Sequence, residues 1–339
     1  MNYKSCWITL NRTCNLRCQW CYAKTTRYLS KDTMDLKTAF DIVDICTHIG
    51  IKHITLIGGE PTLYPYLTDV IKNIHSKKIK CGFVSNGLKF DDESYVKELI
   101  DCGIKHFSVS LKGEDREIFK KVTGEDAFEK VVKGIENCIN NNANVSVSMV
   151  LTEDNIESYI RGIEKMKSIG VDNFHLSFCY EFNPYSNPAI HNNPKRIIKS
   201  FIKNYPVLDR ITQHKFSLSQ SYPMCIWDKN FIAKLESRGQ ITSICQLLNK
   251  SGLIFDTQAN IIPCNAMHEL KLGQLYKDFN NAEELLRYVS KNDFKKVYDK
   301  LCGIPDVSCL TCSDLKRCAG GCVCQWTNYS FKELLSMTE

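Results

Sequence analysis

Three cysteines near the start of the chain have the spacing of a metal-binding loop. Cys14, Cys18 and Cys21 lie four and three residues apart, directly after an expected strand. Soft thiolates select zinc or iron–sulfur clusters, and a structural zinc site normally needs four ligands. Three cysteines on a four-iron cluster leave one iron open for a small molecule. The spacing favours such a cluster, and a zinc knuckle completed by a distant His or Cys is the alternative.

Small and polar residues follow three further expected strands. Gly58-Gly59-Glu60-Pro61 comes after the second strand, Ser85-Asn86 ends the third and Ser110 ends the fourth. Glycines permit close backbone approach, and a carboxylate can pair with an ammonium group. Because α/β barrels build their sites at the carboxyl ends of strands, these residues are candidates for one site.

The first half of the chain must position these residues, and it reads as strands alternating with amphipathic helices. This pattern is typical of parallel βα units. Apolar residues at three- and four-residue spacing predict helices at 38–48, 95–102 and 128–139. Runs rich in β-branched and aromatic residues predict six strands, at 6–10, 53–57, 80–84, 106–111, 145–151 and 173–178.

A second set of cysteines crowds the C-terminal region. The chain has 18 cysteines, far more than ordinary cytosolic usage. In a reducing compartment such thiols are better explained by metal than by disulfides. The later ones are Cys245, Cys264, Cys302, Cys309, Cys312, Cys318, Cys322 and Cys324.

Composition and patterning bound the class of protein. The 339 residues carry 44 basic and 38 acidic side chains, a modest excess that is spread along the chain, so nucleic acid is not the favoured partner. No apolar run approaches the length of a membrane span, and no secretory signal is visible, so we expect a cytoplasmic protein. We expect a barrel core over residues 1–180, a proline-spaced connector over 181–244 and a cysteine-rich domain over 245–339.

The N-terminal motifs together resemble the signature of the radical S-adenosylmethionine (SAM) superfamily. The resemblance implies a partial (β/α)6 TIM-like barrel whose cluster, held by the first three cysteines, cleaves SAM to a 5′-deoxyadenosyl radical. It also implies that Glu60, after the two glycines, binds the amino group of SAM. The residues expected to contact the cofactor are Trp20, Gly58, Gly59, Glu60, Ser85, Asn86 and Ser110.

The C-terminal cysteines resemble the SPASM domain, which holds auxiliary [4Fe-4S] clusters in peptide-modifying members of this superfamily. The resemblance implies one cluster on Cys245, Cys264 and Cys322, and a second on Cys309, Cys312 and Cys318. Ala259 stands where that family usually has a glycine. Further ligands stay open: Cys324 or Cys302 for the second cluster, and for the first either Cys225 or an iron left open for substrate.

The resemblance implies an enzyme that crosslinks, oxidises or epimerises a ribosomally made precursor peptide, reduced by a donor such as flavodoxin or ferredoxin. Within it, Cys179 and Glu181 are candidate catalytic residues at the barrel mouth, Cys179 as a hydrogen-atom donor for epimerisation. One alternative is a SAM-dependent dehydrogenase of a sugar or aminocyclitol. Another is a non-catalytic iron–sulfur or zinc protein in which the cysteines bind metal only to stabilise the fold.

Overall fold

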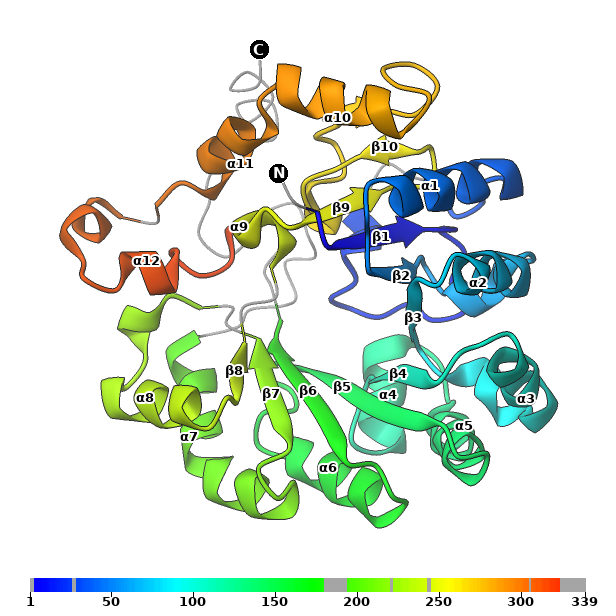
Figure 1. Cartoon of the computed structure of the whole chain (residues 1–339). Coiled ribbons are helices and arrows are strands. Elements are labelled where there is room, and N and C mark those ends of the chain that lie inside the picture. The colour runs from blue at the N-terminus through cyan, green and yellow to red at the C-terminus, as the bar shows by residue number, and fades with distance from the viewer. Residues whose placement is uncertain are drawn as a thin grey trace.

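The computed structural model describes residues 3–25, 29–179, 194–219, 222–242, 245–304 and 306–323. Within this part of the chain an 11-stranded sheet has the order β11-β10-β9-β1-β2-β3-β4-β5-β6-β7-β8 (Figure 1). The strands are β1 (Ser5–Thr9), β2 (His53–Ile57), β3 (Lys80–Ser85), β4 (His106–Leu111), β5 (Asn144–Leu151), β6 (Asn173–Phe178), β7 (Phe216–Ser219), β8 (Ile241–Thr242), β9 (Gly252–Phe255), β10 (Asn260–Ile261) and β11 (Gly273–Gln274).

The sheet is parallel from β9 through β1 to β8, and β10 alone runs the other way, so that its pairs with β9 and with β11 are antiparallel. All six strands that the sequence predicts are present, each within one residue at either end. The prediction of an α/β, TIM-like partial barrel with a cysteine-rich C-terminal region is therefore confirmed.

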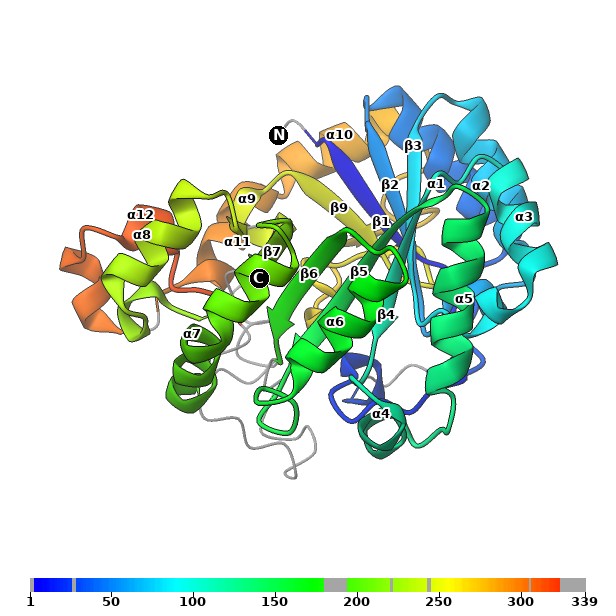
Figure 2. The same cartoon turned by 90° about the horizontal axis from the view of Figure 1, so that it is seen from below.

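Helices α1 to α3 and α5 to α7 lie around the outside of the sheet (Figures 1 and 2). Side-chain caps fix several of their starts, since Asp35 accepts a hydrogen bond from Thr38 N at 2.9 Å and Asp115 accepts one from Ile118 N at 2.9 Å. The helices are α1 (Leu36–His48), α2 (Leu67–Ser76), α3 (Glu93–Asp101), α4 (Arg116–Thr123), α5 (Phe128–Asn140), α6 (Tyr159–Ser168), α7 (Pro194–Ile211), α8 (Lys229–Ser237), α9 (Gln246–Asn249), α10 (Ala282–Lys291), α11 (Phe294–Cys302) and α12 (Leu315–Cys318).

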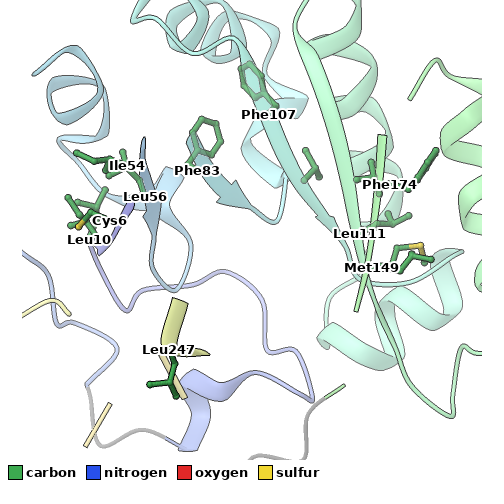
Figure 3. Close-up of a cluster of buried hydrophobic side chains, with 14 of the residues drawn as sticks. Cys6, Leu10, Ile54, Leu56, Phe83, Phe107, Leu111, Met149, Phe174 and Leu247 are labelled. Carbon is green, nitrogen blue, oxygen red and sulfur yellow. The ribbon is translucent and has the colours of Figure 1, made fainter. Parts of the chain in front are cut away.

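Strands β4 to β7 have two unlike faces. The face toward the helices is apolar, and there Phe107 of β4 meets Phe83 of the neighbouring β3 with ring centroids 5.6 Å apart (Figure 3). The opposite face alternates with it and carries partly exposed serines and histidines instead. A packed barrel interior would carry bulky aliphatic residues at these positions, so this wall is built to meet polar groups.

The region that the sequence analysis treats as a connector contributes to the same sheet. Its described part holds α7, β7, α8 and β8, and β7 pairs with β6. Pro194 begins α7 and Pro206 lies inside it, which is why the helical pattern was hidden. The domain boundaries themselves stay a prediction.

Asp209 ties α7 to the turn that precedes β8. Its Oδ1 accepts a hydrogen bond from Gln240 Nε2 at 2.8 Å and lies 2.7 Å from His214 Nδ1, while its Oδ2 pairs with Arg238. Burial alone would raise the pKa of Asp209, but these hydrogen bonds lower it to about 2. The charged carboxylate is therefore part of the folded state.

We expect Asp209→Asn to lower the free energy of unfolding by about 2 kcal/mol at neutral pH. Because the folded pKa lies below the unfolded one, this stabilisation is complete above the unfolded pKa and is lost as pH falls toward about 2. Urea unfolding of both chains at neutral pH and at about pH 2 measures the difference. An equal difference at both pH values would show that packing, not charge, is responsible.

The C-terminal region returns to the first strand of the chain. β9 pairs in parallel with β1, with Cys6 opposite Leu253 and Ile8 opposite Phe255. This pairing brings the segment around Cys264 back to the loop that carries Cys14. Among the described helices, none is long and apolar enough to cross a bilayer.

Candidate functional site

The loop after β1 carries the three N-terminal cysteines and is fastened to the end of α4. The backbone N–H groups of Arg17 and Gln19 donate to the carbonyl oxygens of Thr123 and Val122, both at 2.9 Å. The loop is thus fixed along its length although it has no regular structure. Within it Cys14 is exposed, Cys18 is buried and Cys21 is half-buried.

The three thiols lie close enough to oppose one another's ionisation. Although Cys14 is partly open to solvent, the surrounding loop desolvates its thiol and raises its pKa to about 11. The Leu16 N–H lowers this pKa, and the Glu60 carboxyl and the Cys18 and Cys21 thiols raise it further. Several thiolates can form together here only if a cation binds them, which makes these residues a fit donor set for a metal cluster.

Among the residues that the structure describes, no three His, Cys, Asp or Glu side chains form a group that could hold a metal ion in the arrangement shown. The assignment of a cluster to Cys14, Cys18 and Cys21 stays a prediction.

Gly58 and Gly59 let the cysteine loop lie directly against the end of β2. Gly59 N donates to Asn11 O at 2.8 Å. A Cβ on Gly58 would lie 2.8 Å from Asn11 O, and one on Gly59 would lie 2.7 Å from the carbonyl carbon of Arg12 and inside contact distance of Thr13 O. The close approach that the sequence predicts is therefore made by the protein's own cysteine loop.

Glu60 is buried and accepts hydrogen bonds at both carboxylate oxygens. Its Oε1 accepts from Thr62 N at 3.1 Å, Thr62 Oγ1 at 2.7 Å and Ser85 Oγ at 2.8 Å. Its Oε2 accepts from Asn86 N at 2.7 Å. Burial raises the pKa of Glu60, and these bonds, that from Asn86 N first, act to lower it. The carboxylate is held in one orientation before any ligand arrives.

Asn86 links this carboxylate to the cysteine loop. Its Nδ2 donates to Asn15 Oδ1 at 2.7 Å and lies 4.0 Å from Cys14 Sγ, while its Oδ1 accepts from Leu88 N at 3.0 Å. The structure thus joins, through hydrogen bonds, residues from the ends of three strands. Those brought together with Cys14 are Gly58, Gly59, Glu60, Ser85 and Asn86, and their roles toward a cofactor stay predictions.

The other expected cofactor contacts lie around this centre. Trp20 is half-buried in the cysteine loop. Ser110 lies at the end of β4, and its hydroxyl is 3.1 Å from that of Ser148 on β5 rather than joined to the Glu60 network. Cys179 is buried just past the end of β6, where its N–H donates to Leu151 O at 2.9 Å. Glu181 and Cys324 lie outside the described residues.

The first group of C-terminal cysteines comes together as the resemblance implies. Burial raises the pKa of Cys245 to about 12, and the neighbouring thiols of Cys264 and Cys322 add to the shift. Cys245 precedes α9 and Cys264 precedes the short helix η5 (Asn265–Met267). Their service as cluster ligands stays a prediction.

The second group forms a compact knuckle. Cys309 lies in the short helix η6 (Val307–Thr311), and its carbonyl accepts from Cys312 N at 3.2 Å. Cys318 ends α12, and its N–H donates to Asp314 O at 2.7 Å. Two tight turns thus hold three thiols in one short stretch.

Two cysteines that the sequence left open can now be placed. Burial raises the pKa of Cys302 to about 11, and its charged neighbours are Lys250 and Asp299 rather than thiols. Cys225 has the opposite surroundings: burial raises its pKa, and among its neighbours the thiol of Cys318 contributes most. The sequence allows Cys225 as a ligand of the first group, whereas in the structure it lies beside the second, since Met224 N donates to Cys318 Sγ.

Tyr22 lies between the N-terminal loop and the first C-terminal group. It begins the short helix η1 (Tyr22–Thr25), which contacts η5. Burial raises the pKa of Tyr22 to about 12, Arg12 opposes this, and the thiols of Cys21 and Cys264 both add to it. The two cysteine sets are therefore near neighbours.

Sequence reasoning missed the polar wall on the inner faces of β4 to β7. His175 lies between two hydroxyls of β7, with Nδ1 2.8 Å from Ser217 Oγ and Nε2 3.0 Å from Ser219 Oγ. Burial lowers the pKa of His175, so the ring is neutral near pH 7. Alternation of Ser with apolar residues in the expected strands was the signal that could have revealed it.

Comparisons with known proteins agree with this architecture. The Radical SAM superfamily profile matches residues 8–166. The GTP 3',8-cyclase of Clostridium perfringens (strain SM101) is 35% identical over 151 residues, which cover 43% of this chain and 46% of that protein. A probable GTP 3',8-cyclase of Saccharolobus islandicus (strain M.14.25) is 31% identical over 215 residues, 62% of this chain and 68% of that protein. The match thus spans about half the length of the clostridial relative.

Solved structures match over nearly the whole chain. Streptococcus suis SuiB bound to the precursor peptide SuiA superposes with a TM-score of 0.73 at 18% identity, covering 98% of this chain and 76% of that one. Native anSMEcpe with bound AdoMet gives 0.71 at 18% identity, covering 98% and 94%. At such identities the likeness shows the fold. From the profile, the Saccharolobus relative and the arrangement of cysteine loop, glycine pair and buried glutamate, the chain belongs to the radical SAM superfamily.

Proposed function

We propose that this protein uses a radical generated from SAM to remove a hydrogen atom from a peptide substrate. The observation that carries the proposal is the fold match to SuiB, described as bound to its precursor peptide, which extends over 98% of this chain and so includes the C-terminal cysteine groups. The expected products are a crosslink, an oxidation or an epimer.

In this proposal the cysteine loop and the Glu60 network form the cofactor site. Cys14, Cys18 and Cys21 would hold a [4Fe-4S] cluster, which when bound supplies one electron to SAM. Glu60, fixed by its four donors, would accept from the ammonium group of SAM, and Asn86 holds the cysteine loop at the required distance. Trp20 and Ser110 would border the same site.

The C-terminal cysteines would carry auxiliary clusters on the path of electrons. The contact between η1 and η5 supports this, because it brings Cys264 near the N-terminal loop. A flavodoxin or ferredoxin would be the reductant, in the reducing cytoplasm where such thiols persist.

A nucleotide is the second candidate substrate, because curated relatives at 31–35% identity are named GTP 3',8-cyclase. That similarity covers 43% and 62% of this chain. The inner wall favours a peptide over a triphosphate. Strands β4 to β7 contain no Asp, Glu, Lys or Arg, so they offer hydroxyls and imidazoles but no lysine or arginine to bind phosphate.

One assay separates these functions. Anaerobically reconstituted protein is incubated with reductant and SAM, together with either GTP or a short precursor peptide encoded beside the gene. Mass spectrometry then measures 5′-deoxyadenosine and the mass of each substrate. Loss of two hydrogens from the peptide indicates a crosslink or oxidation, and unchanged mass with deuterium uptake from heavy water indicates epimerisation. Conversion of GTP alone would reject the peptide proposal, and no SAM cleavage would reject both.

If the enzyme epimerises its peptide, Cys179 is the candidate donor of the hydrogen atom to the substrate radical. By the alternation of β6 it shares a face with His175 and Ser177, the polar inner wall. If it returns the hydrogen atom, Cys179→Ala should lower deuterium incorporation into the peptide at least about tenfold while 5′-deoxyadenosine still forms. Unchanged deuterium uptake would dismiss this role, and Ser177→Ala is the matched control on the same strand.

A further inference from the structure

Cys225 is presented by a short, well-anchored turn. It is the middle residue of the helix η4 (Met224–Ile226), and Met224 and Trp227 on either side of it are buried. Trp227 stacks on Phe231 with ring planes 9° apart and packs on Phe178 at 5.6 Å. The neighbours of Cys225 are thus fixed in the core, while Cys225 itself is exposed.

Two polar contacts fasten this turn and α8 to the knuckle of Cys309, Cys312 and Cys318. The backbone N–H of Met224 donates to Cys318 Sγ at 3.2 Å. Arg317, next to that cysteine, pairs with Glu236 on α8 at 2.7 Å. Figures 1 and 2 both show α12 beside α8. An N–H that points at sulfur favours the thiolate, and such bonds commonly surround iron–sulfur clusters.

Cys225 lies beside the knuckle. The residue directly before it, Met224, donates its backbone N–H to Cys318 Sγ at 3.2 Å. Cys302, the competing fourth thiol, instead has Lys250 and Asp299 as neighbours. Cys245 interacts with Cys264 and Cys322 and so belongs to the other group.

We infer that Cys225 supplies the fourth thiolate of an iron–sulfur cluster held by Cys309, Cys312 and Cys318. This rests on the proposed function only in taking the bound metal to be a cluster. Four thiolates close the coordination of a four-iron cluster, so this centre would pass electrons rather than bind substrate. The ligand would then come from between β7 and α8, and would lock the barrel to the C-terminal knuckle.

Protection of the thiol tests the inference without any substitution. Cys225 is exposed, so an alkylating reagent should label it in the apo-protein at an alkaline pH that offsets the raised pKa of its thiol. In anaerobically reconstituted holoprotein the labelling rate should fall at least about tenfold, as a bound thiolate is no longer a free nucleophile. Mass spectrometry of the labelled peptides gives the rate at this cysteine. Equal rates in both forms would overturn the inference.

Metal content tests it a second way. In a background with Cys14, Cys18 and Cys21 replaced by Ala, Cys225→Ala should lose up to about four irons per chain or show a three-iron electron paramagnetic resonance signal. Cys225→Ser should retain iron at a shifted potential, since an alkoxide can replace a thiolate. Cys302→Ala is the matched control and should keep all the iron. Full iron in Cys225→Ala, loss of iron in Cys302→Ala, or one zinc in place of the cluster would each overturn the assignment.

The result of this iron measurement does not depend on whether the substrate is a peptide. With the N-terminal cysteines intact, wild-type protein reports SAM cleavage and peptide modification, whereas the iron count of the background variants reports only the C-terminal centres. Failure to modify any peptide would leave the metal result intact. Failure of Cys225 to bind iron would in turn leave the proposed SAM cleavage untouched, because that reaction depends on the N-terminal cysteines.

Discussion

Replacing Gly59 with alanine is expected to abolish SAM cleavage, with a loss of at least about 100-fold in 5′-deoxyadenosine formation. The new Cβ would lie 2.7 Å from the carbonyl carbon of Arg12 and closer still to the carbonyl oxygens of Arg12 and Thr13. These atoms are backbone, so no side chain can swing away. The loop that carries Cys14 must therefore move away from β2.

The displacement would also break the hydrogen bonds that hold the cysteine loop in register with the segment after β2. Gly59 N donates to Asn11 O at 2.8 Å and Glu60 N donates to Thr13 O at 2.7 Å. Overpacking of this kind costs about 3 kcal/mol. We therefore expect less iron bound at the N-terminal site as well as lower activity, measured by iron content and by thermal unfolding.

Gly82→Ala is the matched control for this substitution. Gly82 lies on β3, and a Cβ there would meet only the His53 ring at 3.4 Å, an ordinary contact. The variant should keep its iron and its SAM cleavage. If Gly59→Ala behaved like Gly82→Ala, the close fit of the cysteine loop on the glycine pair would not be needed for the site.

Much of the fold could be predicted because the signals are local. Each of the first six strands is a short run of β-branched and aromatic residues, and glycines end two of the helices between them, with Gly103 at φ 109° and Gly170 at φ 100°. The motif of Cys14, Cys18 and Cys21 likewise lies within eight consecutive residues. Local pattern was therefore enough for the barrel and for its first motif.

What escaped prediction depends on contacts between distant segments. Cys225 lies far from Cys318 in the sequence, and only the docking of η4 onto α12 brings them together. Pro206 hid the helical period of α7. Ala259, noted as a departure from a family glycine, adopts φ 59°, so the backbone there does take the left-handed conformation that glycine favours.

The second large effect is expected at the buried carboxylate. In Glu60→Gln an amide NH₂ replaces one of the two acceptor oxygens, so it would face donors on either side: Thr62 and Ser85 at Oε1, or Asn86 N at Oε2. A buried donor left without an acceptor costs about 2 kcal/mol. The charge that would pair with the SAM ammonium group is lost as well, so we expect SAM to bind about 100-fold more weakly. Equilibrium dialysis with labelled SAM measures the affinity.

Glu114→Gln separates the loss of this network from the mere loss of a buried charge. Glu114 is also buried, just past the end of β4, and burial raises its pKa as it raises that of Glu60. Its Oε1 accepts from Ser158, whereas its Oε2 has no hydrogen-bond partner in the described structure. A glutamine at this position can still accept from Ser158 through its amide oxygen, and its NH₂ group would meet no donor at the place of Oε2. Stability and SAM affinity should therefore stay near wild type. If instead both variants lost SAM affinity equally, general destabilisation of the barrel would account for the effect, and the donors gathered around Glu60 would have no special part in holding the cofactor.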